Sequence, residues 1–333
     1  MPELPEVETV RRGLYELIIG RTFKTVTVHD APKIFPNAPS DVEAFLLGAE
    51  VTNVRRRAKV LLIDLSSGYT LVVHLKMTGQ LVFVQSKNSN SSASATSPVT
   101  VSAQESRDES RESRTAQPER DMAGDAAGAE ELRFGAGHPT DSLIGTLPDR
   151  STRVSLTFTD NSTLYFNDQR KFGWLKLVPT AEVPQLPFMQ KVGPEPLEAD
   201  FTATQFAERF TRRANTSIKA ALLDQTVVAG VGNIYADESL WGAYIDPRRK
   251  VKDVSPQEFA LLYAELRDVM NLAIEKGGST DKNYVNAEGK RGSYMDFARV
   301  FRREGLACPR CGATIEKIKH AGRGTHFCPV CQR

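Results

Sequence analysis

The chain has 333 residues, 43 of them Lys or Arg and 41 Asp or Glu, which leaves a net charge of +2 at pH 7. Its apolar fraction of 40% is typical of a globular protein, and no apolar run approaches the roughly 20 residues that span a membrane. All four cysteines lie in the last 26 residues, which excludes a disulfide framework spread through the fold. The length predicts two domains, and the acidic, proline-containing start is not a secretory signal, so we expect a cytoplasmic protein.

An amphipathic helix is predicted at the start, because apolar residues recur at three-to-four spacing over residues 4–18. Alternating apolar residues separated by turn residues follow at 60–75 and again at 154–166, and both patterns are typical of antiparallel hairpins. We therefore predict an α+β fold that begins with an antiparallel β-sandwich domain, residues 2–178, with a helix at its N-terminus.

Residues 85–148 interrupt the strand pattern. They contain ten acidic and six basic residues, and ten serines lie between Ser86 and Ser113. Phe134 is the only aromatic residue among them. Such a segment buries too little apolar surface to offset the entropy lost on ordering, so we predict a disordered insertion between two strands.

The chain becomes helical after residue 200. Ser255-Pro256 is typical of a helix start, and Gly277-Gly278 of the end of that helix. These signals predict a helical domain at 179–294 and a cysteine-containing segment at 295–333. Shorter helices are predicted at 204–213, 217–224 and 234–243.

Two C-x-x-C pairs, separated by sixteen residues, are typical of a structural zinc site with four thiolate ligands. The ligands would be Cys308, Cys311, Cys328 and Cys331. The alternative, two redox pairs, needs a thioredoxin-like setting that the sequence lacks. His320 and His326 lie between the pairs and are interpreted as surface residues, because four sulfurs complete the zinc shell.

The last part of the chain is basic. Residues 282–333 carry eleven basic and four acidic residues, and the glycine-rich loop 317–326 lies between the cysteine pairs. A rigid finger of this kind is suited to a phosphate or a base, so a polyanion partner is one interpretation. The alternative is a solvated surface with uneven charge.

Pro2 is a candidate nucleophile. A small residue after Met1 favours removal of Met1, which would expose a secondary amine with a pKa of about 8. Such an amine can attack an aldehyde-like sugar carbon and form an iminium, with Glu3 and Glu6 as proton carriers. The alternative is a proline that merely follows the start residue.

Taken together, these motifs resemble bacterial formamidopyrimidine-DNA glycosylases. The resemblance covers residues 2–84 and 149–333, and Leu4 favours this branch over that of endonuclease VIII. The motifs that carry it are Met1–Leu14, Arg57-Ala58-Lys59, His74–Gly79, Gln169–Gly173, Val228–Glu238 and the four cysteines.

The resemblance implies a monomeric enzyme of base excision repair that acts on double-stranded DNA associated with the bacterial nucleoid. It would have a helix–two-turn–helix element and one structural Zn²⁺, with DNA bound between two domains. It would remove oxidised purines, such as 8-oxoguanine and formamidopyrimidines, and then cut the backbone by β,δ-elimination.

By the same resemblance, Pro2 is the Schiff-base nucleophile and Glu3 the proton donor and acceptor. Lys59 serves β-elimination and Arg323 serves δ-elimination. A flipped base leaves a gap that needs a wedge. The residues that match the family's DNA contacts are Met77, Arg170 and Phe172, which would fill the gap, and Lys219 and Asn233, which would contact phosphate.

Several positions depart from the family pattern. Arg153 stands where histidines usually contact DNA, and Arg213 lies beside a position that lacks the expected phosphate-binding lysine. Residues 277–294 match the variable loop that covers the flipped base. An endonuclease VIII-like enzyme for oxidised pyrimidines is therefore an alternative. A non-catalytic lesion-binding protein is another, although intact Pro2, Glu3 and Lys59 argue against it.

Overall fold

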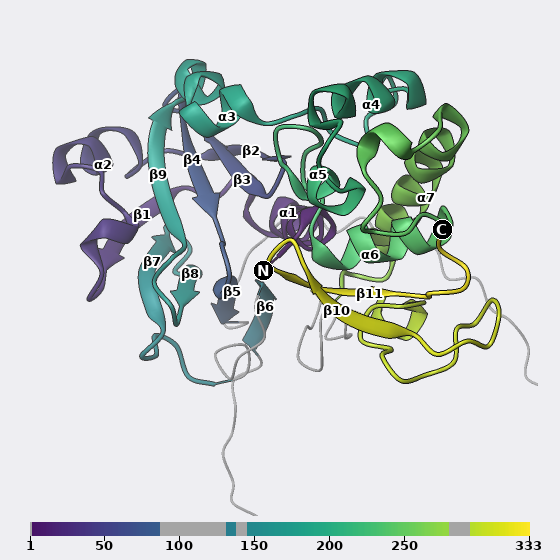
Figure 1. Ribbon diagram of the computed structural model, residues 1–333. Helices are drawn as coiled ribbons and strands as arrows, with labels where there is room; N and C mark the ends of the chain where they lie inside the picture. Colours follow the sequence, from purple (N-terminus) through teal and green to yellow (C-terminus); the bar gives the residue numbers. More distant parts are fainter. Residues whose placement is uncertain (1, 87–130, 138–144, 280–293) are drawn as a thin grey trace, which may run out of the picture. The chain divides into compact units, whose positions relative to one another are not determined.

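Figure 1 presents the computed structural model, which describes residues 2–86, 131–137, 145–279 and 294–333. The α-helices are α1 (Leu4–Ile18), α2 (Pro39–Phe45), α3 (Pro187–Lys191), α4 (Ala203–Phe210), α5 (Ile218–Leu223), α6 (Asn233–Gly242) and α7 (Pro256–Glu275). Short 3-10 helices span Pro32–Ile34, Thr180–Gln185, Thr211–Arg213, Val251–Asp253 and Tyr294–Phe297. No helix in these ranges is both long and apolar enough to cross a membrane.

Two antiparallel sheets form the β part (Figure 1). One has the order β2-β3-β4-β9, and the other the order β1-β7-β8-β5-β6. Their strands alternate or run apolar toward a shared core, which confirms the predicted sandwich. The strands are β1 (Phe23–Val28), β2 (Val51–Arg57), β3 (Val60–Leu65), β4 (Tyr69–His74), β5 (Gly79–Ser86), β6 (Glu131–Gly137), β7 (Thr152–Phe158), β8 (Thr163–Asp168) and β9 (Trp174–Pro179).

Helix α1 connects the sheets to the helical part. Its predicted apolar stripe is buried except at Leu17, which is partly exposed, and the helix packs against β2, β3 and α7. The carboxylate of Glu6 accepts a hydrogen bond of 2.8 Å from the N–H of Glu3 and so satisfies a free donor at the helix start. The start of α1 is therefore held by the Glu6 side chain, and the helix as a whole by β2 and β3 of one sheet and by α7 of the helical part.

The helical part has its own core, formed mainly by α4, α5, α6 and α7. Thr202 begins α4 and Ser255 begins α7, each with a capping box, and these starts agree with the predicted ones to within two residues. A hairpin of β10 (Glu316–His320) and β11 (Arg323–Phe327) follows, and β11 packs against α6.

The predicted disorder of residues 85–148 is wrong for residues 131–137, which form β6 beside β5. Phe134 is 1% exposed and lies over Gly13 of α1, where an added Cβ would be 2.3 Å from the ring. The Phe134 ring thus packs on a glycine that lies 121 residues earlier in the chain, on a helix. Local composition does not reveal such a distant partner. Residues 87–130 and 138–144, also within the predicted insertion, lie outside the described residues.

Two deletion variants distinguish the contribution of residues 88–129 to stability from that of β6. Replacing residues 88–129 with a short Gly/Ser turn should change the melting temperature little, because loop-closure cost grows only slowly with length. Extending the deletion through Gly137 also removes Phe134 and should destabilise the protein by about 3 kcal/mol or more. Equal melting temperatures for the two variants would contradict the role assigned to β6.

Candidate active site and DNA-binding residues

The carboxylate of Glu3 lies against the start of α6. Glu3 is 5% exposed; its Oε1 accepts a 3.4 Å hydrogen bond from the N–H of Ile234, and its Oε2 has no partner among the described residues. Gly232 makes this approach possible, since an added Cβ would be 2.0 Å from the Glu3 carboxyl carbon. Gly230 has φ +79° and its carbonyl accepts a 3.1 Å hydrogen bond from Leu4. The glycines of this loop thus let it pack directly on the first residues of α1.

Burial changes the acidity of this carboxyl group. The pKa of Glu3 is raised from 4.5 to about 7, chiefly by desolvation, while nearby Lys59 acts to lower it and Glu6 to raise it. A carboxyl group with this pKa is present in both protonation states at neutral pH. It can therefore both donate and accept a proton there.

Lys59 lies in the tight turn between β2 and β3, where Ala58 has φ +52°. The buried carboxylate of Glu195 fixes this turn by binding Arg56 at 2.8 Å, Arg57 at 2.9 Å and the N–H of Ala58 at 2.5 Å. The basic run at the end of β2 is thus used inside the protein, so it does not form a free cationic face.

The Lys59 ammonium is buried and donates a 2.8 Å hydrogen bond to the carbonyl of Val231. Desolvation lowers its pKa, while Glu3 and Glu6 oppose that change. Gln225 binds the same carbonyl at 2.8 Å and accepts from the N–H of Gly230 at 2.9 Å. Glu3, just before α1, and Lys59, in the turn between β2 and β3, therefore converge on the loop before α6.

The three predicted wedge residues lie together on the surface. Met77 is 39% exposed and Phe172 is 52% exposed. The Arg170 guanidinium lies 4.9 Å from the centroid of the Phe172 ring and donates a 3.3 Å hydrogen bond to the sulfur of Met77. An exposed Phe stacked by a cation is not a core residue, so the structure favours an interaction role for this group.

Arg153 and Arg213 are placed differently from the expectation that they contact DNA. Arg153 is 4% exposed, and its guanidinium binds the carbonyl of Asp168 at 2.8 Å and Asp30 at 2.6 Å. Arg213 is exposed but pairs with Asp224 at 2.5 Å. The charge of the buried Arg153 is thus paired with Asp30, whose side chain is 62% exposed.

Lys219 is fully buried, which conflicts with the predicted phosphate contact. Its ammonium pairs with Asp237 at 2.6 Å and also binds the hydroxyl of Thr325 at 2.7 Å. Asn233 donates a 2.9 Å hydrogen bond to the carbonyl of Gly324, at the tip of the β10–β11 hairpin. Arg323 is exposed at the same tip, and its charge lowers the pKa of Lys59 together with the larger effect of desolvation. The finger tip therefore faces the Lys59 region.

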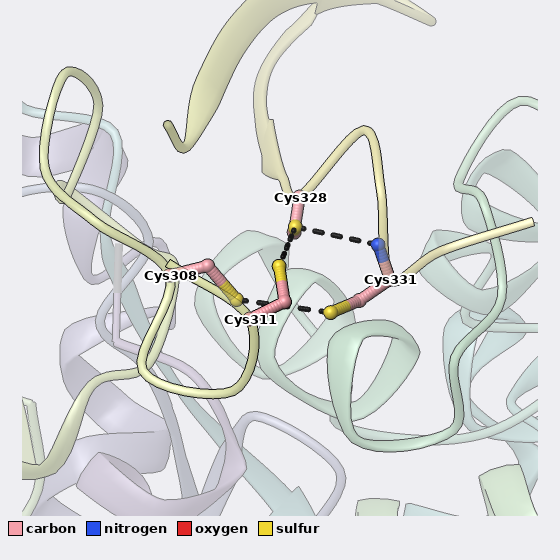
Figure 2. A group of neighbouring side chains, drawn as sticks. All are labelled: Cys308, Cys311, Cys328 and Cys331. Atoms are coloured by element: carbon pink, nitrogen blue, oxygen red, sulfur yellow. Dashed lines mark hydrogen bonds between the residues drawn. The ribbon is translucent and has the colours of Figure 1, made fainter. Parts of the chain in front are cut away.

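The four cysteines converge from two turns, as Figure 2 shows. Their sulfur atoms all lie within 4.8 Å of one another, with Cys308 to Cys331 at 3.9 Å and Cys311 to Cys328 at 3.5 Å. Four Zn–S bonds of about 2.3 Å in a tetrahedron place the sulfurs roughly 3.8 Å apart. The arrangement fits one structural zinc ion.

Comparisons with known proteins agree with this geometry. Residues 1–175 match the family model described as the formamidopyrimidine-DNA glycosylase N-terminal domain, and residues 192–284 match its H2TH domain. Residues 305–333 match the zinc finger found in FPG and IleRS. A formamidopyrimidine-DNA glycosylase of Herpetosiphon aurantiacus is 38% identical over 333 residues, all of both chains. The chain belongs to the formamidopyrimidine-DNA glycosylase family.

Solved structures of this family are similar over the whole chain. A mutant of the Lactococcus lactis enzyme in complex with DNA containing Fapy-dG has a TM-score of 0.75 and 29% identity, with complete coverage of both chains. The wild-type enzyme with DNA containing an oxidised pyrimidine has a TM-score of 0.74 and the same identity and coverage. The present chain is accordingly a DNA-binding glycosylase of base excision repair with a zinc finger.

Two acidic residues of this glycosylase have roles that the sequence did not indicate. The buried Asp237 pairs with Lys219 and binds the N–H of His326 at 2.9 Å. The buried Glu238 accepts hydrogen bonds from three consecutive N–H groups, at residues 299–301. Together they attach the finger to α6. Their adjacent positions in the matched segment 228–238 were the available signal.

The expectation for the two histidines is half right. His326 is 3% exposed, so it is not a surface residue, and it binds Asp237 rather than taking part in the sulfur cluster. The imidazole of His320 lies 2.8 Å from the hydroxyl of Ser217, the N-cap of α5. The loop 277–294, expected to cover a flipped base, is described only to residue 279 and from residue 294.

Replacing one thiolate should release the metal from this glycosylase. Cys328→Ser should lose its single equivalent of zinc and its affinity for duplex DNA, because zinc binding organises the finger that carries Arg323. Val330→Ser, a change of an exposed residue in the same turn, is the matched control. Full zinc content and DNA affinity in Cys328→Ser, by metal analysis and a binding titration, would contradict the assignment.

The pKa of Glu3 predicts a pH-dependent stability. The folded protein holds this proton more tightly than the unfolded chain, so the contribution of Glu3 to the free energy of unfolding falls as the pH rises from about 4.5 to about 7. Glu3→Gln should remove up to about 3 kcal/mol of that decline, measured by urea unfolding at pH 5 and pH 8.

A second carboxyl group provides a control of opposite sign. A hydrogen bond from Arg249 lowers the pKa of Glu258 to about 2. Its contribution to stability is therefore present above about 4.5 and is lost only as the pH falls toward 2. Glu258→Gln should be destabilised equally at pH 5 and pH 8. An identical pH profile for Glu3→Gln and wild type would refute the raised pKa of Glu3.

Proposed function

We propose that this glycosylase removes oxidised purines from duplex DNA, acts as a monomer, and uses Pro2 as its nucleophile after removal of Met1. The observation that carries the proposal is the buried Glu3 carboxylate, next in sequence to Pro2, with Lys59 nearby and one oxygen that has no partner in the described part of the chain. Base removal through an imine requires an amine nucleophile and an acid. The start of the chain with Pro2, the desolvated Glu3 and the buried Lys59 amine lie at one place and would supply them.

In the proposed mechanism the Pro2 amine attacks C1′ of the flipped nucleotide, and the bond from C1′ to the base breaks. The proton lost by the attacking amine goes to the leaving base, and Glu3 opens the sugar ring by protonating its oxygen. The resulting iminium on Pro2 makes the C2′ protons acidic. A carboxyl group with a pKa of about 7 is suited to these transfers in both directions at neutral pH.

Strand cleavage follows from the iminium. Loss of a C2′ proton expels the 3′ phosphate, and a second elimination expels the 5′ phosphate. We assign Lys59 to the first elimination and Arg323 to the second, because a cation beside each departing phosphate stabilises the charge that develops there. The hydrogen bond between Asn233 and Gly324 supports this by fixing the tip that carries Arg323.

Base extrusion is assigned to Met77, Arg170 and Phe172. The exposed Phe172 ring would occupy the space that the flipped base leaves, and Arg170 would hydrogen-bond the base left without a partner. The stacking of Arg170 on Phe172 supports this assignment, because the guanidinium and the ring already lie together at the surface before DNA binds. Among the expected phosphate ligands we retain Asn233, and we reassign Lys219 and Arg153 to structural roles.

The lesion class needs a direct comparison. The Lactococcus lactis relative was solved with Fapy-dG and with an oxidised pyrimidine, so an endonuclease VIII-like preference is the second candidate. Single-turnover excision of 8-oxoguanine opposite cytosine should exceed that of thymine glycol. A faster reaction with thymine glycol would assign the chain to oxidised pyrimidines instead.

Borohydride trapping should identify the nucleophile. On an 8-oxoguanine duplex it should yield one covalent adduct, mapped by mass spectrometry to the peptide that begins with Pro2. The rival amine is Lys59, whose pKa is lowered by burial. Lys59→Ala should therefore still trap, whereas a protein with an uncleaved N-terminal extension should not. An adduct on the peptide containing Lys59, or trapping by the extended protein, would sink the assignment of Pro2.

A further inference from the structure

Asp168, at the end of β8, is a fully buried carboxylate that binds two separate loops. Its Oδ1 accepts hydrogen bonds from the hydroxyl of Thr78 and, at 3.1 Å, from the N–H of Arg170. Its Oδ2 accepts one from the N–H of Gly173 at 2.7 Å. Neither the mechanism nor the metal site uses this residue.

The two loops carry the exposed group described above. Thr78 follows Met77 in the loop between β4 and β5, and Arg170 and Phe172 lie in the loop between β8 and β9. The hydroxyl of Thr78 also accepts a 3.2 Å hydrogen bond from the N–H of Arg170. Thr78 and Asp168 therefore connect the bases of both loops directly beneath the exposed side chains.

Other contacts hold the second loop from outside. Lys171 has φ +57°, and its ammonium pairs with Asp30 at 2.9 Å. Asp30 also binds Arg153, which in turn binds the backbone carbonyl of Asp168. Gly173 allows the close approach, since an added Cβ would be 2.7 Å from the ring of Phe166. The loop begins at Asp168, which also binds its last residue, Gly173. It is held from outside by the pair between Lys171 and Asp30.

We propose that Asp168 is a positioning residue that holds the Met77 loop and the Arg170–Phe172 loop as one preassembled wedge. The inference rests on the proposed role of these side chains in base extrusion. A wedge that is ordered before binding avoids the entropy cost of ordering two loops on the DNA. Because Asp168 is fully buried, it acts through the loops and does not contact DNA.

The chemistry requires a carboxylate at this position. All three partners are donors, and an ionised carboxylate accepts through both oxygens, with stronger bonds than a neutral group forms. In Asp168→Asn one oxygen becomes an NH₂ group, which faces either the Gly173 N–H or the Thr78 and Arg170 donors. Either the Gly173 N–H or the Arg170 N–H then loses its acceptor on this residue, so the full set of three hydrogen bonds cannot form.

The test compares a duplex reaction that needs the wedge with a reaction that does not. Asp168→Asn and Thr78→Val are assayed for single-turnover excision of 8-oxoguanine from a duplex. They are also assayed for nicking of a preformed abasic site in single-stranded DNA. Fluorescence of 2-aminopurine next to the lesion reports unstacking. Thr70→Val is the matched control, because its buried hydroxyl donates a similar hydrogen bond of 2.8 Å to Asp64 in the other sheet.

The expected result is a selective loss. Asp168→Asn and Thr78→Val should each lose about tenfold in duplex excision and in the rate of unstacking, while nicking of single-stranded abasic DNA stays within about twofold. Thr70→Val should behave as wild type in all three assays. Equal losses in the duplex and single-stranded reactions, or no loss in either, would overturn the positioning role.

Phe172→Ala separates this inference from the function on which it rests. If Phe172→Ala loses duplex excision while Asp168→Asn does not, the wedge stands and the role of Asp168 is overturned. If Phe172→Ala excises from the duplex as wild type does, the wedge assignment itself fails, and the proposal for Asp168 fails with it.

Discussion

The packing of the Gly230–Gly232 loop against the first turn of α1 is the contact on which the site depends. It brings an acidic side chain from the chain start, an ammonium from a β-turn and the first turn of α6 to one place through direct hydrogen bonds. Desolvation gives Glu3 a pKa near neutrality and lowers that of Lys59. A side chain larger than hydrogen would meet Leu4 at Gly230 and the Glu3 carboxyl group at Gly232, so either substitution would disturb this packing.

Most of the cations near this site serve the fold. Arg56 and Arg57 bind Glu195, Arg153 binds Asp30, and Lys219 binds Asp237. The Lys219–Asp237 pair is fully buried, so removing one partner would leave an uncompensated buried charge, which is costly. Arg323, in contrast, is exposed at the hairpin tip and is available to a polyanion.

Features that depend on local spacing could be predicted from the sequence. The stripe of α1, the β3–β4 hairpin and the four thiols need only periodicity or a fixed spacing. Features that depend on a distant partner could not. Lys219 reads as a surface cation until Asp237 is placed beside it, and Phe134 reads as a lone aromatic until Gly13 receives it. The family resemblance singled out Glu3 and Lys59, but it could not say that burial perturbs the acidity of both.

The residues of the proposed site come from two stretches of the chain, one before residue 87 and one after residue 130. Pro2, Glu3, Lys59 and Met77 all precede residue 87, whereas Arg170, Phe172, Arg323 and the cysteines all follow residue 130. The two stretches meet along several antiparallel strand pairs, among them β1 with β7, β5 with β8 and β4 with β9. A chain cut between residues 87 and 130 would yield two fragments, each without part of the proposed site. The proposed nucleophile would lie in one fragment and the zinc ligands in the other, so neither fragment alone would hold the whole site.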